Sequence, residues 1–239
     1  MTRFLLPDLS RRLRGEELMD RPDVREGELR VALGNVAEAN YRFAGLRSLL
    51  RHVGPHAIGR TQLSLLDVGV GNGAVSRTLS RILARRGVRV RWVGLDFHPV
   101  VLNVARAELS GSDGFGGLVR GDGTRLPFPD RSFDVSTATL TFHHLVDGDC
   151  VRMLAEMARV TRLAVVVSDL ERSLVNYLGA RLLSETLWRS DPLTRHDAGV
   201  SVRRSFTADE LRALASEVPF GSVIVRRHFP FRLVLEGRP

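Results

Sequence analysis

Strand-like apolar segments alternate with amphipathic helical segments through the middle of the chain. Continuous or alternating apolar runs predict strands at residues 63–68, 88–96, 118–120, 133–139 and 163–169. Apolar positions at helical spacing predict helices at 74–86, 99–110 and 147–160. Strands that alternate with helices of this length are typical of βαβ units, so we predict an α/β fold with a doubly wound, mainly parallel sheet.

The regions on either side of this core have their own patterns. Residues 1–24 are polar and interrupted by prolines, which predicts a loosely packed arm. Apolar residues from Leu29 to Leu50 recur at three-, four- and seven-residue steps and predict one long amphipathic helix over 25–51. Asn40 lies on this apolar stripe, where it would either be a hydrogen-bonded core amide or face a ligand.

After the fifth predicted strand, residues 171–205 form a long polar insertion that we expect to be a cap or lid. Thr207 and Glu210 form a capping box that predicts the start of the last helix. Two strand-like segments then follow on either side of Phe229 and Pro230, which predicts an antiparallel hairpin at the edge of the sheet. We therefore expect a single domain over 1–239, with a helical extension and lid at 1–60, a cofactor-binding core at 61–170, a lid at 171–205, and a last helix and hairpin at 206–239.

The composition fits one substantial core, because 44% of the 239 residues are hydrophobic. The net charge is +8, and all 35 basic residues are arginines. These arginines are spread from Arg3 to Arg238 instead of clustering. We therefore do not expect a nucleic-acid partner, although phosphate binding depends on such cations. The absence of lysine excludes a Schiff-base lysine and a P-loop lysine.

Cys150 is the only cysteine, which excludes intramolecular disulfides and zinc sites built from several cysteines. We expect it to be a small buried residue. The apolar run at 4–7 is too short for a signal peptide, and no stretch approaches the roughly 20 apolar residues that cross a bilayer. These observations predict a cytoplasmic protein.

A glycine-rich turn follows the first predicted strand. Residues 65–73 read LLDVGVGNG, with Asp67 at the strand end and Gly69, Gly71 and Gly73 before the next helix. Glycines allow a sharp turn and a close approach of a ligand to the backbone. The spacing is G-x-G-x-G, which disfavours the usual dinucleotide-binding turn.

Two further acids follow the next two strands. Asp96, in VGLDFHP, is placed to accept hydrogen bonds from ribose hydroxyls, and Asp122, in GDGTRLPFPDRSFDV, from the exocyclic amine of an adenine. Asp96 could instead cap the helix at Pro99, and Asp122 could be a turn residue beside Gly123. The ordered sequence of one glycine-rich turn and two acids favours an adenosyl cofactor.

Residues 63–145 resemble the cofactor-binding core of class I methyltransferases, particularly the ubiquinone/menaquinone-type C-methyltransferases, through LLDVGVGNG, VGLDF, GDGTRLPFPDRSFDV and TLTFHHL. The resemblance implies a Rossmann-like sheet of order 3-2-1-4-5-7-6 and S-adenosylmethionine as cofactor, with no metal. It implies Asp67 and the three glycines around the methionine moiety, and Asp96 on the ribose. Phe97 would lie against the adenine, Asp122 and Gly123 at its edge, and Thr139 near the sulfonium. Residues 168–183 and 193–207 also resemble methyltransferases that accompany bacterial polyketide pathways.

Methyl transfer from a sulfonium is an in-line displacement that needs no metal, but a phenol or quinol acceptor benefits from a base. Three histidines are candidate catalytic residues: His143 and His144 after the fourth strand, and His196 beside Asp197 in the insertion. Each could instead be a framework or loop residue, and we favour His144 or His196 as the base. Arg172, Tyr177, Arg195 and Arg203 could orient a polar acceptor.

These residues predict a methyltransferase that acts on an oxygen or carbon of a small aromatic, quinol or polyketide-like acceptor. An RNA or other nucleic-acid methyltransferase is the first alternative, but TATLTFHHL contains no Asn-Pro-Pro-Tyr-like motif and no catalytic cysteine. A non-catalytic protein that binds S-adenosylmethionine is the second alternative. No glycine or acid of the cofactor motif is missing, which argues against it.

Overall fold

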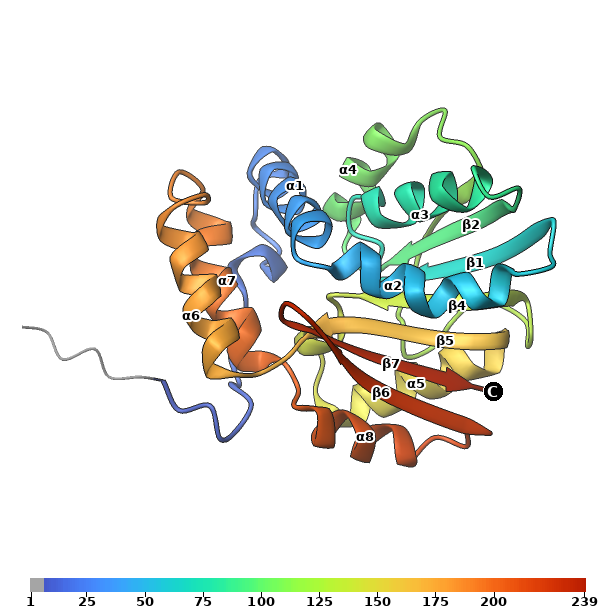
Figure 1. The fold of residues 1–239 in the computed structure, drawn as a ribbon. Helices are drawn as coiled ribbons and strands as arrows, with labels where there is room; N and C mark the ends of the chain where they lie inside the picture. The colour runs from blue at the N-terminus through green and yellow to red at the C-terminus, as the bar shows by residue number, and fades with distance from the viewer. Residues whose placement is uncertain (1–6) are drawn as a thin grey trace, which may run out of the picture.

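A seven-stranded sheet forms the centre of the structure, a computed structural model that describes residues 7–239 (Figure 1). The strands are β1 (Gln62–Val68), β2 (Arg89–Asp96), β3 (Phe115–Arg120), β4 (Phe133–Thr139), β5 (Thr161–Leu170), β6 (Ser222–His228) and β7 (Arg232–Arg238). Their order is β3-β2-β1-β4-β5-β7-β6, and only β7 runs antiparallel to its neighbours β5 and β6. The expected fold class and strand order are confirmed.

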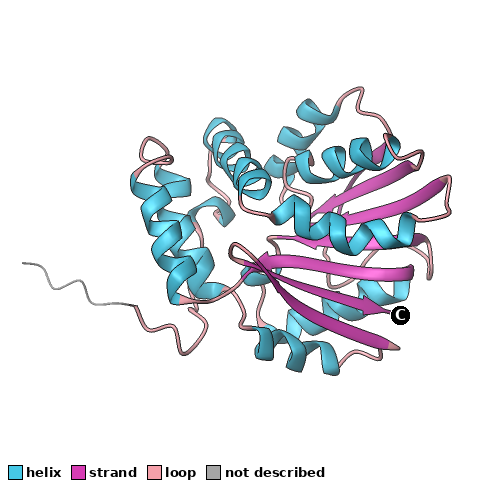
Figure 2. Cartoon of the chain, viewed as in Figure 1, coloured by secondary structure: helices cyan, strands magenta, loops and turns pink. Residues whose placement is uncertain are grey.

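Helices cover both faces of this sheet and continue beyond one of its edges (Figure 2). The α-helices are α1 (Glu26–Arg42), α2 (Gly45–Val53), α3 (Ala74–Ala84), α4 (Pro99–Leu109), α5 (Asp147–Val160), α6 (Leu174–Glu185), α7 (Pro192–Arg204) and α8 (Ala208–Ser216). Short 3-10 turns occur at η1 (Leu18–Asp20), η2 (Gly54–Ala57) and η3 (Phe142–His144). In Figure 1, α2 to α4 lie on one face, α5 and α8 lie on the other, and α1, α6 and α7 lie beyond the carboxyl ends of the parallel strands.

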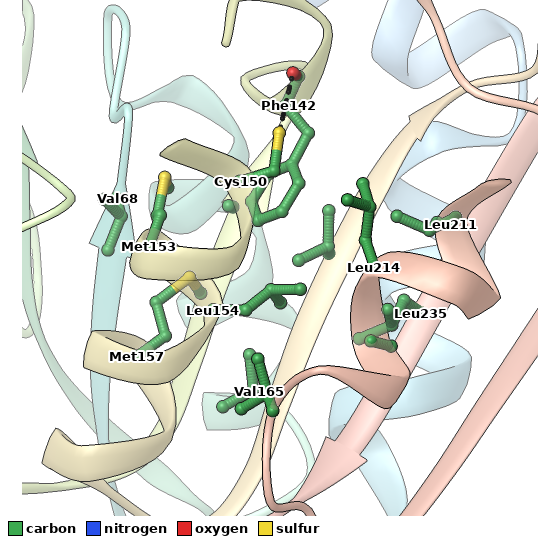
Figure 3. Close-up of a cluster of buried hydrophobic side chains, with 14 of the residues drawn as sticks. Val68, Phe142, Cys150, Met153, Leu154, Met157, Val165, Leu211, Leu214 and Leu235 are labelled. Atoms are coloured by element: carbon green, nitrogen blue, oxygen red, sulfur yellow. Dashed lines mark hydrogen bonds between the residues drawn. The ribbon is translucent and has the colours of Figure 1, made fainter. Parts of the chain in front are cut away.

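Two hydrophobic clusters hold these layers together, one on each face of the sheet. The cluster under α5 and α8 contains Phe142, Met153, Leu211 and the fully buried Cys150, as Figure 3 shows. Each fully buried leucine-sized side chain contributes about 1.5–3 kcal/mol by leaving water. Cys150 is thus a small core residue, as its sequence context predicts.

The expected single helix over 25–51 is wrong, because the chain bends between α1 and α2. Ala44 adopts a left-handed conformation with φ of 60°. A side chain on Gly45 would collide with the buried side chain of Asn40, so the bend depends on a glycine there. The bend sends α2 along the sheet, where it packs on β5, and α1 across its edge, where it packs on α4 and α7.

The other flanking segments are more ordered than their polar sequences suggest. The insertion after β5 folds as α6 and α7, which pack against each other, and α7 begins with Asp191 accepting a hydrogen bond from the Thr194 amide. Residues 7–24 pack on α7, with the Leu13 amide bonded to the Arg203 carbonyl, while 1–6 of the expected arm lie outside the described residues. The capping box of Thr207 and Glu210 and the edge hairpin of β6 and β7 are confirmed. Within 7–239, none of the helices has the length and hydrophobicity needed to cross a membrane.

Candidate functional site

A cavity of about 920 Å³ opens at the carboxyl ends of the parallel strands. Strand ends and the loops that follow them form one side, while η1, α1, α6 and α7 contribute the opposite side. Parallel sheets bind ligands at this edge, and ligand pockets range from about 300 to 1,000 Å³. The cavity is therefore large enough for a cofactor and a second molecule.

All the expected cofactor residues except Gly73 line this cavity: Asp67, Gly69, Gly71, Asp96, Phe97, Asp122, Gly123 and Thr139. Gly69 has φ of +74°, and a side chain there would collide with Thr141. Gly73 instead gives room to the side chain of Leu109 and precedes α3 directly. The glycine-rich turn thus leaves open backbone at the cavity wall, as a closely bound ligand requires.

Two buried carboxylates lie in this turn region. Asp67 accepts hydrogen bonds from Ser76 Oγ at 2.6 Å and from Thr137 Oγ1 at 3.1 Å, and burial raises its pKa to about 6. Asp96 accepts from the amides of His98 at 3.0 Å and Gly71 at 3.3 Å, and burial raises its pKa as well. The N-cap of α4 is His98, so Asp96 fixes the turn and faces the cavity instead of capping the helix.

The remaining residues expected to bind the cofactor differ in their exposure and in the hydrogen bonds that they already make. Asp122 Oδ1 accepts from the amide and hydroxyl of Thr124, so it is a turn residue that also lines the cavity. The Phe97 side chain is 63% exposed at the cavity margin. Thr139 Oγ1 is buried with no hydrogen-bond partner among the described residues. An adenosyl cofactor offers groups that suit an exposed aromatic face and unpaired polar atoms.

The structure brings His143 and His144 to the cavity but leaves His196 outside its lining. His143 is buried, with Nδ1 2.7 Å from Asp169 Oδ1, which makes it part of the framework. His144 Nδ1 lies 2.7 Å from Asp20 Oδ2. Burial would lower the pKa of His144, but the charge of Glu17 and the hydrogen bond and charge of Asp20 raise it to about 9.

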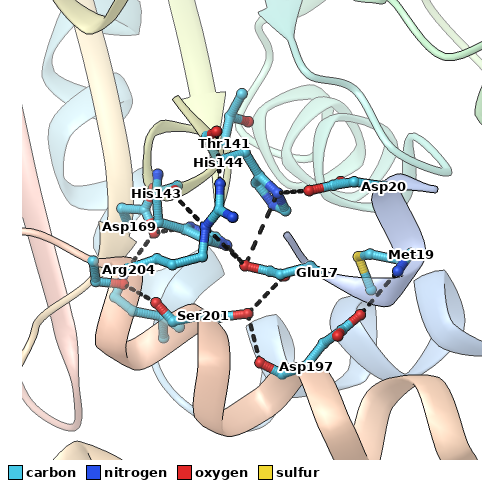
Figure 4. Close-up of polar contacts among 12 residues, drawn as sticks. Glu17, Met19, Asp20, Thr141, His143, His144, Asp169, Asp197, Ser201 and Arg204 are labelled. Atoms are coloured by element: carbon cyan, nitrogen blue, oxygen red, sulfur yellow. Dashed lines mark hydrogen bonds and ion pairs between the residues drawn. The ribbon is translucent and has the colours of Figure 1, made fainter. Parts of the chain in front are cut away.

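Glu17 and Asp20 come from the N-terminal segment, and sequence reasoning missed both (Figure 4). Glu17 is 1% exposed, with Oε1 3.5 Å from His143 Nε2 and 3.7 Å from Arg204 Nε. Asp197 of α7 accepts hydrogen bonds from the amides of Leu18 and Met19, which fixes η1 against the histidines. The exposed loop composition of 7–24 gave no signal for these contacts.

Two arginines donate hydrogen bonds to the backbone of the turn that carries His143 and His144. Arg204 donates from Nε to the His143 carbonyl at 3.0 Å and from Nη2 to the His144 carbonyl at 2.7 Å. Arg12 donates to the Leu145 carbonyl at 2.9 Å and lies over the Phe206 ring. The backbone of η3 is therefore held in place by two arginines that come from the N-terminal segment and from α7.

The four side chains expected to orient an acceptor do not line the cavity: Arg172, Tyr177, Arg195 and Arg203. Arg172 is buried, pairs with Glu210 and donates to the carbonyls of Leu9 and Ser205, which is a structural role. Asn40 does line the cavity, but its Oδ1 has no hydrogen-bond partner among residues 7–239. Arg232, which sequence reasoning did not single out, also lines the cavity.

Ligand atoms of Glu17, His143 and His144 lie within 4.8 Å of one another, a grouping that could hold a metal ion. Two contacts oppose this use. His144 Nδ1 is engaged by Asp20, and the Arg204 guanidinium already faces Glu17. The expectation that no metal takes part stays a prediction.

Comparison with known proteins agrees with this geometry. A family model described as a methyltransferase domain matches residues 65–163. A demethylmenaquinone methyltransferase of Deinococcus radiodurans is 33% identical over 114 residues, covering 48% of this chain and 45% of the relative. A phthiotriol/phenolphthiotriol dimycocerosates methyltransferase of Mycobacterium leprae is 30% identical over 181 residues, covering 73% of this chain and 58% of the relative. The chain thus spans about half the length of these curated relatives.

Solved structures share most of this fold. Human N-acetylserotonin methyltransferase in complex with S-adenosylmethionine aligns with a TM-score of 0.65 at 17% identity, covering 90% of this chain and 56% of that one. A methyltransferase from Aquifex aeolicus aligns with a TM-score of 0.61 at 14% identity, covering 87% and 97%. Residues 65–163 thus match a methyltransferase domain, and the strand order and these likenesses show that the chain has the fold of the class I S-adenosylmethionine-dependent methyltransferases.

Proposed function

We propose that this protein transfers a methyl group from S-adenosylmethionine to an oxygen or carbon of a small aromatic, quinol or polyketide-like acceptor. The observation that carries the proposal is the cavity of about 920 Å³, which joins the glycine-rich turn to a chamber under α1, α6 and α7. The chamber is lined largely by apolar side chains, among them Leu29, Leu33, Phe43 and Leu183. Such a lining suits an apolar acceptor and excludes water from the reaction.

The cofactor would be held on the β1 to β4 side of the cavity. In this proposal Asp96 binds the ribose, Phe97 lies against the adenine face, Asp122 and Gly123 lie at the adenine edge, and Thr139 lies near the sulfonium; all of them line the cavity. Two observations support this fit. A side chain at Gly69 would collide with Thr141, and the Thr139 hydroxyl is buried without a hydrogen-bond partner among the described residues. S-adenosylmethionine, when bound, supplies an activated methyl group and needs no metal for that purpose.

His144 is our candidate base for the acceptor. Asp20 binds Nδ1 and so leaves Nε2 as the nitrogen available to an acceptor proton. Because the pKa of His144 is about 9, only the protein molecules in which the imidazole is neutral can accept the proton. Once protonated, the imidazole holds the proton firmly at neutral pH. The acceptor's oxygen or carbon then gains the methyl group as its proton remains on His144.

An isotope experiment tests the function directly. The protein is incubated with methyl-labelled S-adenosylmethionine and separate samples of alkylphenols, quinols, polyketide aromatics and bulk tRNA. Label recovered in a small aromatic or quinol is the expected result. Label recovered only in RNA would replace the small-molecule acceptor with a nucleic acid, and a protein that fails to bind the cofactor would refute the proposal as a whole.

A further inference from the structure

Arg232, a buried arginine in the wall of the cavity, has two nitrogens that find no hydrogen-bond partner among the described residues. Arg232 is 2% exposed, and no acceptor among residues 7–239 takes a hydrogen bond from its Nε or Nη1. Buried guanidinium groups normally have their donors satisfied, because an unpaired buried charge is costly. Burial lowers the pKa of Arg232 to about 10, which still leaves it protonated at neutral pH.

The nearest source of compensation within the protein is already used. Asp169 acts on Arg232 by its charge, but its oxygens accept hydrogen bonds from His143 Nδ1 at 2.7 Å, the His143 amide at 3.2 Å and the Leu170 amide at 2.7 Å. These bonds fix the carboxylate toward η3. The donors of Arg232 therefore remain for a group that enters the cavity.

The position of Arg232 places this group on the acceptor side. Arg232 begins β7 and pairs with Leu170 at the end of β5, so it lies at the same edge as the cofactor turn. The cofactor residues follow β1 to β4, whereas β7 is two strands beyond β4 in the sheet. With strands about 4.8 Å apart, Arg232 lies roughly 10 Å from the end of β4 along the sheet.

The surroundings of Arg232 indicate a ligand with an apolar body. Leu170 and Phe231 line the cavity beside it, and the Phe231 ring packs against Gly179 of α6. A planar guanidinium recognises a carboxylate through two parallel hydrogen bonds, which are stronger than neutral ones.

We propose that Arg232 binds a carboxylate of the acceptor, so that the methylated molecule is an apolar acid. The inference rests on the proposed function and narrows its substrate class. It predicts that a hydroxylated aromatic acid is preferred over its uncharged ester, although both present the same ring and the same hydroxyl to the chamber.

The test is calorimetric binding of 3-hydroxy-2-naphthoate and its methyl ester to protein saturated with S-adenosylhomocysteine. Wild type should bind the acid at least about tenfold more tightly than the ester, as expected for a charge-assisted contact. Arg232→Met should abolish this preference and leave the S-adenosylhomocysteine affinity unchanged. Arg238→Met, an exposed position on the same strand, is the matched control and should retain the preference.

Equal binding of acid and ester to wild type would overturn the inference, and this comparison needs no variant to fold. A preference that persists in Arg232→Met would overturn it too, because another group would then bind the carboxylate. Failure of the proposed function has a different signature. It would appear as loss of S-adenosylhomocysteine binding in wild type, which is measured before either naphthalene compound is added.

Discussion

Asp20 and His144 are 124 residues apart in the chain, yet Oδ2 of the first lies 2.7 Å from Nδ1 of the second. The histidine follows β4, and the carboxylate comes from η1, which Asp197 of α7 holds in place. The proposed base is therefore oriented by a segment outside the cofactor-binding core. This arrangement links the activity of the histidine to the packing of the N-terminal segment.

We expect turnover to rise with pH from 7 to about 9, because His144 must be neutral to accept a proton and its pKa is about 9. Asp20→Asn removes a charge and alters a hydrogen bond that both raise this pKa, so the rise in kcat should move to lower pH. The measurement is kcat against pH for wild type, Asp20→Asn and the exposed control Asp23→Asn. A flat profile over this range, or identical profiles for all three proteins, would remove His144 from the role of base.

Asp96→Ala should weaken S-adenosylmethionine binding by roughly 1.5–3 kcal/mol, the range for hydrogen bonds to a charged group. The carboxylate also orders the amides of Gly71 and His98, so its loss loosens the turn. Titration calorimetry measures the effect, and Asp113→Ala, on an exposed loop after α4, is the control. Unchanged affinity in Asp96→Ala would place the ribose elsewhere.

Gly69→Ala should abolish detectable cofactor binding and lower the free energy of unfolding by more than Gly111→Ala does. Both positions have φ above +70°, so alanine costs about 1–2 kcal/mol of backbone strain at each. A side chain at Gly69 also meets Thr141, whereas nothing lies within 4 Å of one at Gly111. Denaturant unfolding of the two variants separates collision from strain, and equal losses would contradict the close approach at Gly69.

Arg232→Met should leave the free energy of unfolding unchanged or raise it, because it removes a buried charge that has no ion pair among the described residues. Arg172→Met should lower it by roughly 1.5–3 kcal/mol, since Arg172 donates to Glu210 and two carbonyls. Thermal unfolding of the two variants gives the comparison. Marked destabilisation by Arg232→Met would mean that this side chain holds the fold together.

Chelation with EDTA should leave methyl transfer unchanged. His143 and His144 of the grouping are hydrogen-bonded to Asp169 and Asp20, and Arg204 faces Glu17, so charged side chains of the protein already occupy the positions around it. Activity is measured before and after dialysis against the chelator, with metal analysis of the dialysed protein. Loss of activity that returns on adding Zn²⁺ or Mg²⁺ would refute the prediction.

The cofactor side could be predicted from sequence because its signals are local. Asp67, Gly69 and Asp96 lie at strand ends that apolar runs make visible, and the strand order brings them to one edge. Periodicity alone could not show the bend at Ala44, because the apolar stripe continues across it. At that bend the side chain of Asn40 lies against Gly45, a local close approach that the spacing of apolar residues does not reveal.

The acceptor side could not be predicted in the same way, because its charged residues are brought together by long-range packing. Glu17 reaches His143 across more than a hundred positions, and nothing in its neighbours in sequence distinguishes it from a solvated glutamate. Arg172 and Arg232 look alike in sequence as well. One is fully paired and the other is not, which only their three-dimensional surroundings show.

The left-handed turn at Ala44 lets a single stretch of chain serve two surfaces. After this turn, Ser48 and Leu49 of α2 are buried against the sheet. Before it, Leu29 and Leu33 of α1 line the cavity on the side opposite the strand ends. Side chains of α1 that face the cavity can therefore change while α2 keeps its contacts with the sheet. This separation gives an evolving or engineered lineage a way to change its acceptor while inheriting its methyl donor intact.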